Sequence, residues 1–204
     1  MNTVMQKVTP AANSMIQKVS PSATSMIRMD HTHVLATFHR YRVDSPANVK
    51  RGLVNTVCIA LEVHAQLEEE IFYPAVRAVS DNEAIRKSVP EHNEMRRLIA
   101  TLRAMEPTDP GFDDTFMELM RDVIHHVADE ETILLPEAER MLAHRLNDLG
   151  AEMTRRRMQL VAPRTGEIGV NMVRGMPRAT LVMATGAVLT ACMALRHFRK
   201  GRYQ

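Results

Sequence analysis

A histidine followed four residues later by a glutamate occurs twice in this sequence. The two pairs are His64 with Glu68 and His126 with Glu130, and a proline stands ten residues after each histidine. Residues four apart share one face of a helix, so each pair presents an imidazole and a carboxylate to the same side. Imidazole with carboxylate, and without thiolate, suits iron or manganese and is compatible with zinc. The duplicated pattern therefore predicts a metal site.

Apolar periodicity decides which histidines face the core of a helical protein. In the segment that starts at Phe112, the apolar stripe passes through His126 and Ile133, whereas His125 falls in line with acidic residues. The same test turns one histidine inward on each of four segments. The predicted inward set is His31, His64, Glu68, His92, His126 and Glu130. The histidines predicted to face solvent are His33, His39, His125, His144 and His197.

Four imidazoles and two carboxylates are costly to bury without partners, and a bound metal removes that cost. A single inward histidine is usually a satisfied core residue, and a single pair is usually a surface pair, so the prediction depends on the combination. Six ligands suit two octahedral ions bridged by the glutamates better than one tetrahedral ion. We predict two non-haem iron ions, with manganese or zinc less favoured. Glu69, Glu70, Asp129 and Glu131 are assigned to outer or surface positions, and for Tyr73 packing is favoured over contact with the site.

Long helices are needed to position these residues. Ala, Leu, Met, Glu and Arg dominate, and Gly and Pro are sparse in the middle of the chain, which favours helices. Helices are predicted over 25–43, from the residue after Pro46 to about 79, over 81–105 with a kink or break at Pro90, and from 112 towards 146 with a bend at Pro136. A basic extension over 148–160 is predicted to be helical too. Four helices joined by short loops predict an all-α, up-down-up-down four-helix bundle.

The two ends of the chain differ from its middle. Residues 1–24 contain an 11-residue repeat and are predicted to be a flexible or partly helical leader, and the bundle with its basic extension occupies 25–162. A linker is predicted at 163–177, followed by a hydrophobic helix with a basic tail at 178–204. The uncharged stretch 179–195 lies between basic residues, which favours an anchor in the inner membrane. Three alternatives stay open for this stretch: a helix packed on the bundle, a helix packed in a homo-oligomer, and a helix lying in the membrane interface.

Composition narrows the functional classes. A net charge of +2 is too small to indicate binding to nucleic acid. The N-terminus lacks the apolar stretch of a signal peptide, and the two cysteines lie far apart, which argues against a disulfide. We therefore predict that the bundle lies in the reducing cytoplasm.

The combined motifs resemble those of the bacterial hemerythrin-like, or HHE cation-binding, domain. The resemblance covers about residues 26–146 and is carried by Asp30-His31, the run from His64 to Ala75, Glu91-His92 and the run from His125 to Glu131. It implies a helical bundle with a non-haem di-iron centre, in which the four inward histidines are ligands and Glu68 and Glu130 are bridging carboxylates. Two positions depart from the family pattern of oxygen-carrying hemerythrin. Arg96 stands where that protein has a second histidine on the third helix, and Glu130, four residues after the last histidine, replaces an aspartate five residues after it.

These departures argue against simple reversible oxygen carriage, and Arg96 is expected to turn away or to pair with Glu68, Glu94 or Glu130. The leading hypothesis is a di-iron protein that binds or reacts with oxygen, peroxide or nitric oxide in stress defence or sensing. A non-catalytic iron-binding, oxygen-binding or iron-handling protein is the first alternative, so whether the chain is an enzyme stays open. A membrane-associated structural adaptor is the last. Turnover of hydrogen peroxide by the iron-loaded protein separates the first two.

Overall fold

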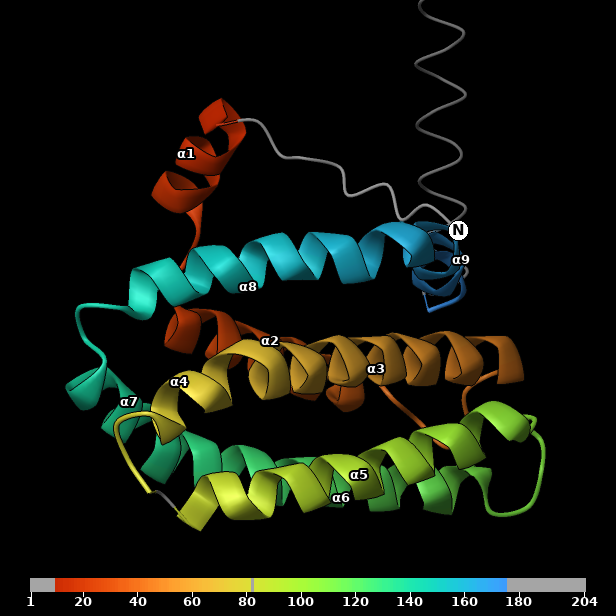
Figure 1. The fold of residues 1–204 in the computed structure, drawn as a ribbon. Coiled ribbons are helices and arrows are strands. Elements are labelled where there is room, and N and C mark those ends of the chain that lie inside the picture. The colour runs from red at the N-terminus through yellow and green to blue at the C-terminus, as the bar shows by residue number, and fades with distance from the viewer. Residues whose placement is uncertain (1–9, 82, 176–204) are drawn as a thin grey trace, which may run out of the picture.

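The computed structural model describes residues 10–81 and 83–175, and the side chains from residue 14 onwards. Every regular element within these ranges is a helix, which confirms the all-α prediction. Four long helices lie alongside one another (Figure 1). They are α2 (Ala23–His39), α3 (Ala47–Leu67), α5 (Glu83–Ala104) and α6 (Phe112–Asp129). Pro90 lies inside α5, which is a single helix through that position.

The core of these helices has two apolar clusters. The first cluster contains Phe116 and residues from all four long helices. The second contains Phe72 and also residues from later in the chain, such as Leu149. On α2, α3 and α5 the inward histidine lies between residues of the first cluster and residues of the second; on α2, for example, His31 stands between Ile27 and Val34. After His126 on α6, the chain reaches the second cluster at Leu134, beyond the end of that helix. The polar layer is therefore enclosed by apolar packing on both sides, which limits its contact with water.

Both helices that carry a histidine and glutamate pair widen at the glutamate. The π-helical turn η1 (Glu68–Phe72) joins α3 to α4 (Tyr73–Arg77), and η2 (Glu130–Leu134) joins α6 to α7 (Leu135–Met141). The Tyr73 N–H donates to the Glu68 carbonyl and the Leu135 N–H donates to the Glu130 carbonyl, five residues back. A proline follows each of these donors, and its ring clashes with the carbonyl four residues back in a regular α-helix. The wider turn removes that clash, so each chain continues instead of ending or bending sharply.

The basic extension forms α8 (Leu146–Val161), which lies along α2 and α3 (Figure 1). Gly150 permits the close approach, because a Cβ there would lie 2.0 Å from the Pro21 carbonyl oxygen. The predicted flexible leader contains the helix α1 (Pro10–Val19), which contacts α8; Gln17 donates a 2.8 Å hydrogen bond to Asp148.

The linker predicted at 163–177 is described up to residue 175, and there the structure differs from the prediction. A short 3-10 turn, η3 (Ala162–Arg164), leads into α9 (Thr165–Arg174), and α9 packs against α3. At Gly52 of α3, an added Cβ would lie 2.7 Å from the Gly175 nitrogen, so the absence of a side chain lets the two segments meet. The glycines that indicated a linker are compatible with a helix here because tertiary packing supplies the stability that helix propensity does not.

The helices over 10–81 and 83–175 include none that is long and apolar enough to cross a membrane. The hydrophobic helix and basic tail expected at 178–204 fall outside these ranges, so the membrane anchor at 179–195 stays a prediction.

Candidate metal centre

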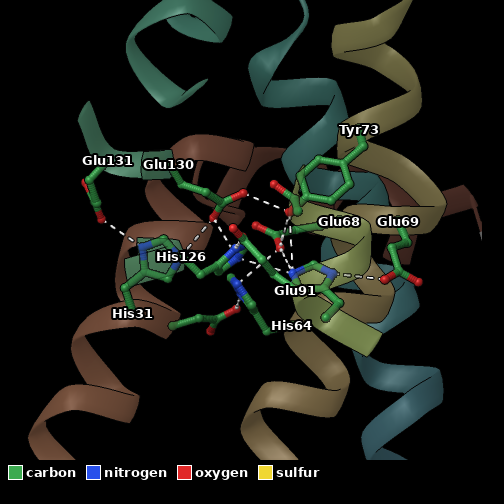
Figure 2. A network of polar contacts seen from close by, with 12 residues as sticks. His31, His64, Glu68, Glu69, Tyr73, Glu91, His126, Glu130 and Glu131 are labelled. Atoms are coloured by element: carbon green, nitrogen blue, oxygen red, sulfur yellow. Dashed lines mark hydrogen bonds and ion pairs between the residues drawn. The ribbon is translucent and has the colours of Figure 1, made fainter. Parts of the chain in front are cut away.

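The six predicted inward residues meet in one buried cluster between the long helices (Figure 2). Helices α2, α3, α5 and α6 contribute one histidine each, and the two glutamates are the first residues of the π turns. The histidines are at most 4% exposed and both glutamates are 0% exposed. His33, His39, His125 and His144 are exposed, as predicted, and His197 lies outside the described residues.

Each glutamate lies between a histidine of α2 or α3 and a histidine of α5 or α6. The Glu68 Oε2 atom is 3.2 Å from His64 Nε2 and 3.4 Å from His92 Nε2. The Glu130 Oε2 atom is 3.3 Å from His31 Nε2 and 3.5 Å from His126 Nε2. This geometry places each carboxylate where it can bridge two ions, with His31 and His64 on one side and His92 and His126 on the other.

Four polar atoms of the cluster have no hydrogen-bond partner among the residues described. They are His31 Nε2, His64 Nε2, Glu68 Oε1 and Glu130 Oε2. A buried polar atom without a partner costs about 1–3 kcal/mol, and more for a charged group. Within each of two subsets, one donor atom per residue lies within 4.8 Å of the others; the subsets are His31, His64, Glu68 and Glu130, and Glu68, His92 and His126. The donor set therefore fits metal ions in both its chemistry and its orphaned atoms.

The outer nitrogen of every inward histidine contacts a carboxylate. The Nδ1 atoms of His31, His92 and His126 lie 2.9 Å from Glu131, Glu69 and Glu91, and His64 Nδ1 lies 3.5 Å from Asp30. Such partners fix the ring orientation and leave the lone pair of Nε2 available to bind a metal. The outer assignment of Glu69 and Glu131 is compatible with these contacts. The sequence alone does not predict the contacts of Asp30 and Glu91, although each directly precedes an inward histidine.

Tyr73 belongs to the cluster, where sequence reasoning favoured packing. Its side chain is fully buried, and its hydroxyl lies 2.8 Å from Glu130 Oε1 and 3.1 Å from Glu68 Oε2 (Figure 2). The hydroxyl is also 3.5 Å from His92 Nε2. The single hydroxyl of Tyr73 therefore lies within hydrogen-bond distance of both glutamates and can donate to either one.

Without metal, the cluster has strongly perturbed titration. Burial opposes protonation of His31, but Glu130, Glu131 and Glu68 raise its pKa to about 9. Burial lowers the pKa of His64 to about 4, because the charge of His31 adds to the desolvation. Burial and the charge of Glu130 raise the pKa of Glu68, whereas the surrounding histidines overcome burial and lower the pKa of Glu130. The two glutamates thus have different protonation preferences although their positions are alike.

Arg96 turns outward from the cluster to a carboxylate that was not among its expected partners. Its Nη2 atom donates to Glu69 Oε2 at 2.8 Å, and Glu94 pairs with Arg97 instead. Arg96 and His92 together lower the pKa of Glu69, overcoming its burial. Arg96 thus turns away from the cluster, as one of the two expectations had it, and its carboxylate partner is Glu69 in place of Glu68, Glu94 or Glu130.

Comparisons with known proteins agree with the geometry. The family model described as Hemerythrin HHE cation binding domain matches residues 22–138. A crystal structure of a hemerythrin HHE cation-binding domain-containing protein, a homologue from Mycobacterium kansasii, is similar with a TM-score of 0.62 and 20% identity, over 76% of this chain and 99% of that chain. A DNA nickase from Nostoc sp. is 29% identical over 127 residues, which are 62% of this chain and 34% of the nickase. The chain thus matches about a third of the length of that relative.

Proposed function

This chain belongs to the hemerythrin HHE cation-binding family, and on that basis we propose that it holds two non-haem iron ions that bind or react with a small oxidant. His31 and His64 would hold one ion, His92 and His126 would hold the other, and Glu68 and Glu130 would be shared between the two. The observation that carries the proposal is the contact of each glutamate with histidines of both pairs. We further propose that α2, α3, α5 and α6 form an up-down-up-down four-helix bundle around the ions.

Iron is favoured by the chemistry of the donors. The proposed ligands are imidazoles and carboxylates without a thiolate, a set that also accepts manganese and is compatible with zinc. Six side chains, two of them shared, would not fill the coordination spheres of two octahedral ions, so positions would remain for a small ligand. When bound, iron supplies the redox capacity towards oxygen, peroxide or nitric oxide.

The residues around the ligands control protons and water. Tyr73 holds a proton between the two carboxylates, because its hydroxyl is within hydrogen-bond distance of both. The outer carboxylates hold each imidazole in one orientation. The apolar clusters on both sides of the polar layer exclude bulk water, which strengthens the electrostatic interactions inside it.

Metal analysis and an optical spectrum test this proposal. Full-length protein purified aerobically under iron-replete conditions is expected to contain about two iron ions per chain and to show near-ultraviolet charge-transfer bands. Stoichiometric zinc without iron would contradict the assignment. Turnover of hydrogen peroxide then separates a reactive centre from non-catalytic iron or oxygen binding, since the latter predicts bound iron without turnover. The nicking activity in the name of the Nostoc relative is not carried over, because the match covers 34% of that protein.

A further inference from the structure

Helix α9 presents an apolar face to solvent. Its inner side packs on α3, where Asn171 is 2% exposed, and Ile168 packs against the second apolar cluster. Away from that contact, Val170, Met172 and Val173 are between 49% and 60% exposed. Single exposed apolar residues are common, but several on one short helix indicate a surface that binds a partner.

Two glycines lie on the same outward side of α9 as Val170 and Val173. The positions of Gly166 and Gly169 are three, four and seven residues from the valines, and this spacing keeps all four residues on one helix face. A Cβ at either glycine would meet nothing within 4 Å, so contacts within the described chain do not require a glycine there. The face is therefore shallow at this point, and a second helix can approach it closely.

The charged residues of α9 lie along one edge of this face. They are Glu167 and Arg174, and both are exposed. Neither forms an ion pair with another residue in the described part of the chain. Seven residues are close to two helical turns, so the two charges are about 10 Å apart along the helix axis. A face with a free negative charge at one end and a free positive charge at the other is complementary to its own reversed copy.

We propose that this face of α9 binds the same face of a second copy of the chain, with the two helices antiparallel. A two-fold axis beside Val170 brings Glu167 of one copy to the partner's Arg174, and symmetry forms the same contact again. The exposed valines of both copies then pack against each other across the axis. A parallel pair would set each charge level with its like and would form neither contact.

The expected dimer is weak and reversible. Helix α9 has 10 residues and is therefore about 15 Å long. A contact of this length covers less than the roughly 800 Å² per partner of a standard interface, which predicts a Kd in roughly the micromolar range. The face contains none of the proposed metal ligands, so this inference does not rest on the proposed function.

Sedimentation velocity of the full-length protein tests the dimer. Between about 1 and 100 µM, the parent protein is expected to show an equilibrium of monomer and dimer. Val173→Glu places a charge at the centre of the face and is expected to raise the Kd at least about tenfold. Val19→Glu, at an exposed valine of α1, is the matched control and is expected to leave the dimer unchanged.

Glu167→Arg and Arg174→Glu test the pairing of charges. Each variant alone sets like charges against each other at both ends of the contact, so each is expected to dimerise about tenfold more weakly than the parent. A mixture of the two variants contains opposite charges at both ends. The mixture is therefore expected to form a heterodimer with about the affinity of the parent dimer.

A parent protein that stays monomeric throughout this range would overturn the proposal, and so would a dimer that Val173→Glu leaves intact. A mixture that associates no better than either charge variant alone would also overturn it. A lipid surface or the stretch 179–195 as the occupant of this face predicts that last result, because neither depends on matched charges in two copies.

Discussion

The helix pair α2–α3 and the helix pair α5–α6 carry the same polar set in the same order. Asp30, His31, His64, Glu68 and Glu69 in the first pair correspond to Glu91, His92, His126, Glu130 and Glu131 in the second. The contacts also correspond. Asp30 and Glu91 each contact the second histidine of their own pair. Glu69 and Glu131 each hold the first histidine of the opposite pair. The ligand set is therefore duplicated, and each half supports the other.

The two halves differ beside the glutamates and at their outer surfaces. The residue after the π turn is Tyr73 in the first half and Leu135 in the second, so a single hydroxyl serves both glutamates. Helix α8 brings Arg157 to Asp30, whose side chain is 15% exposed, whereas Glu91 is 35% exposed. The duplicated residues make up the proposed metal centre, and the unpaired ones distinguish one face of that centre from the other.

Removal of one histidine from either half is expected to have the largest effect. His64→Ala and His126→Ala should each lose at least about one of the two iron ions, because both remove a proposed ligand. Metal analysis by mass spectrometry measures the loss. His125→Ala, which changes an exposed neighbour, should keep its iron. If His125→Ala emptied the site and His126→Ala did not, the orientation of α6 described above would be wrong.

Substitution of Asp30 and of Glu91 tests whether α8, which contacts α2 and α3, makes the two halves bind iron with unequal affinity. Asp30→Asn and Glu91→Gln should each weaken iron binding by about 10- to 100-fold, the usual range for a residue that orients a ligand. Asp30→Asn should be the more damaging, since it also leaves Arg157 without its partner. Competition with a chelator measures both affinities, and Asp148→Asn on the outside of α8 is the control. Equal losses would show that α8 does not strengthen its half.

The contributions of the two outer carboxylates to stability should also differ as the pH falls, with Asp30 contributing more than Glu91. Burial raises the pKa of Asp30, but contacts with His64 and Arg157 overcome it and lower the pKa to about 2. The resulting stabilisation, about 2 kcal/mol, is present above the unfolded pKa near 4 and is lost as the pH falls through about 2. In metal-free protein, the stability gap between the parent and Asp30→Asn should therefore be largest near neutral pH and should narrow below about pH 4.

Denaturant titrations across that range give the gap directly. The corresponding gap for Glu91→Gln should be smaller, because Glu91 is more exposed and screened by solvent. A gap for Asp30→Asn that stayed constant down to pH 2 would count against the pairing with His64 and Arg157.

Tyr73→Phe removes the feature that one half has and the other lacks. The metal-free protein should lose about 1–3 kcal/mol of unfolding free energy, because two buried carboxylates lose a donor. The iron-loaded protein should lose less, since the ions neutralise the same carboxylates. Thermal and denaturant unfolding of both forms measures the difference. Tyr41→Phe is the control, as its hydroxyl contacts Asp113 away from the cluster. An equal loss in both forms would argue against metal bound by Glu68 and Glu130.

Arg96 should matter least, although it occupies a ligand position of oxygen-carrying hemerythrin. Its counterpart in the other half is Leu35, four residues after His31. Arg96→Leu should therefore retain the iron and change stability by less than about 1 kcal/mol, as expected for a partly exposed ion pair. Metal analysis and unfolding curves check this. Loss of iron in Arg96→Leu would show that the pair with Glu69 controls His92.

Helical phase alone predicted that six residues far apart in the sequence face one core. The choice of His126 over His125 depended only on steps of three and four residues, and the structure buries the first and exposes the second. That success ends at the π turn. Ile133 was placed on the inward stripe, but it is 51% exposed and Leu134 is buried. The additional residue of the π turn moves the apolar stripe by one position, and a regular period cannot foresee it.

The remaining features are decided by contacts between segments far apart in the sequence. A carboxylate that follows a proposed ligand glutamate has no recognisable partner until the opposite helix pair is in place, as Glu69 and His92 illustrate. Tyr73 directly follows the π turn and contacts both glutamates, and α9 forms where it can pack on α3 beside Gly52. Local periodicity determines which face of a helix is buried. Packing determines what that face meets, because a side chain's partners depend on helices that its own sequence neighbourhood does not contain.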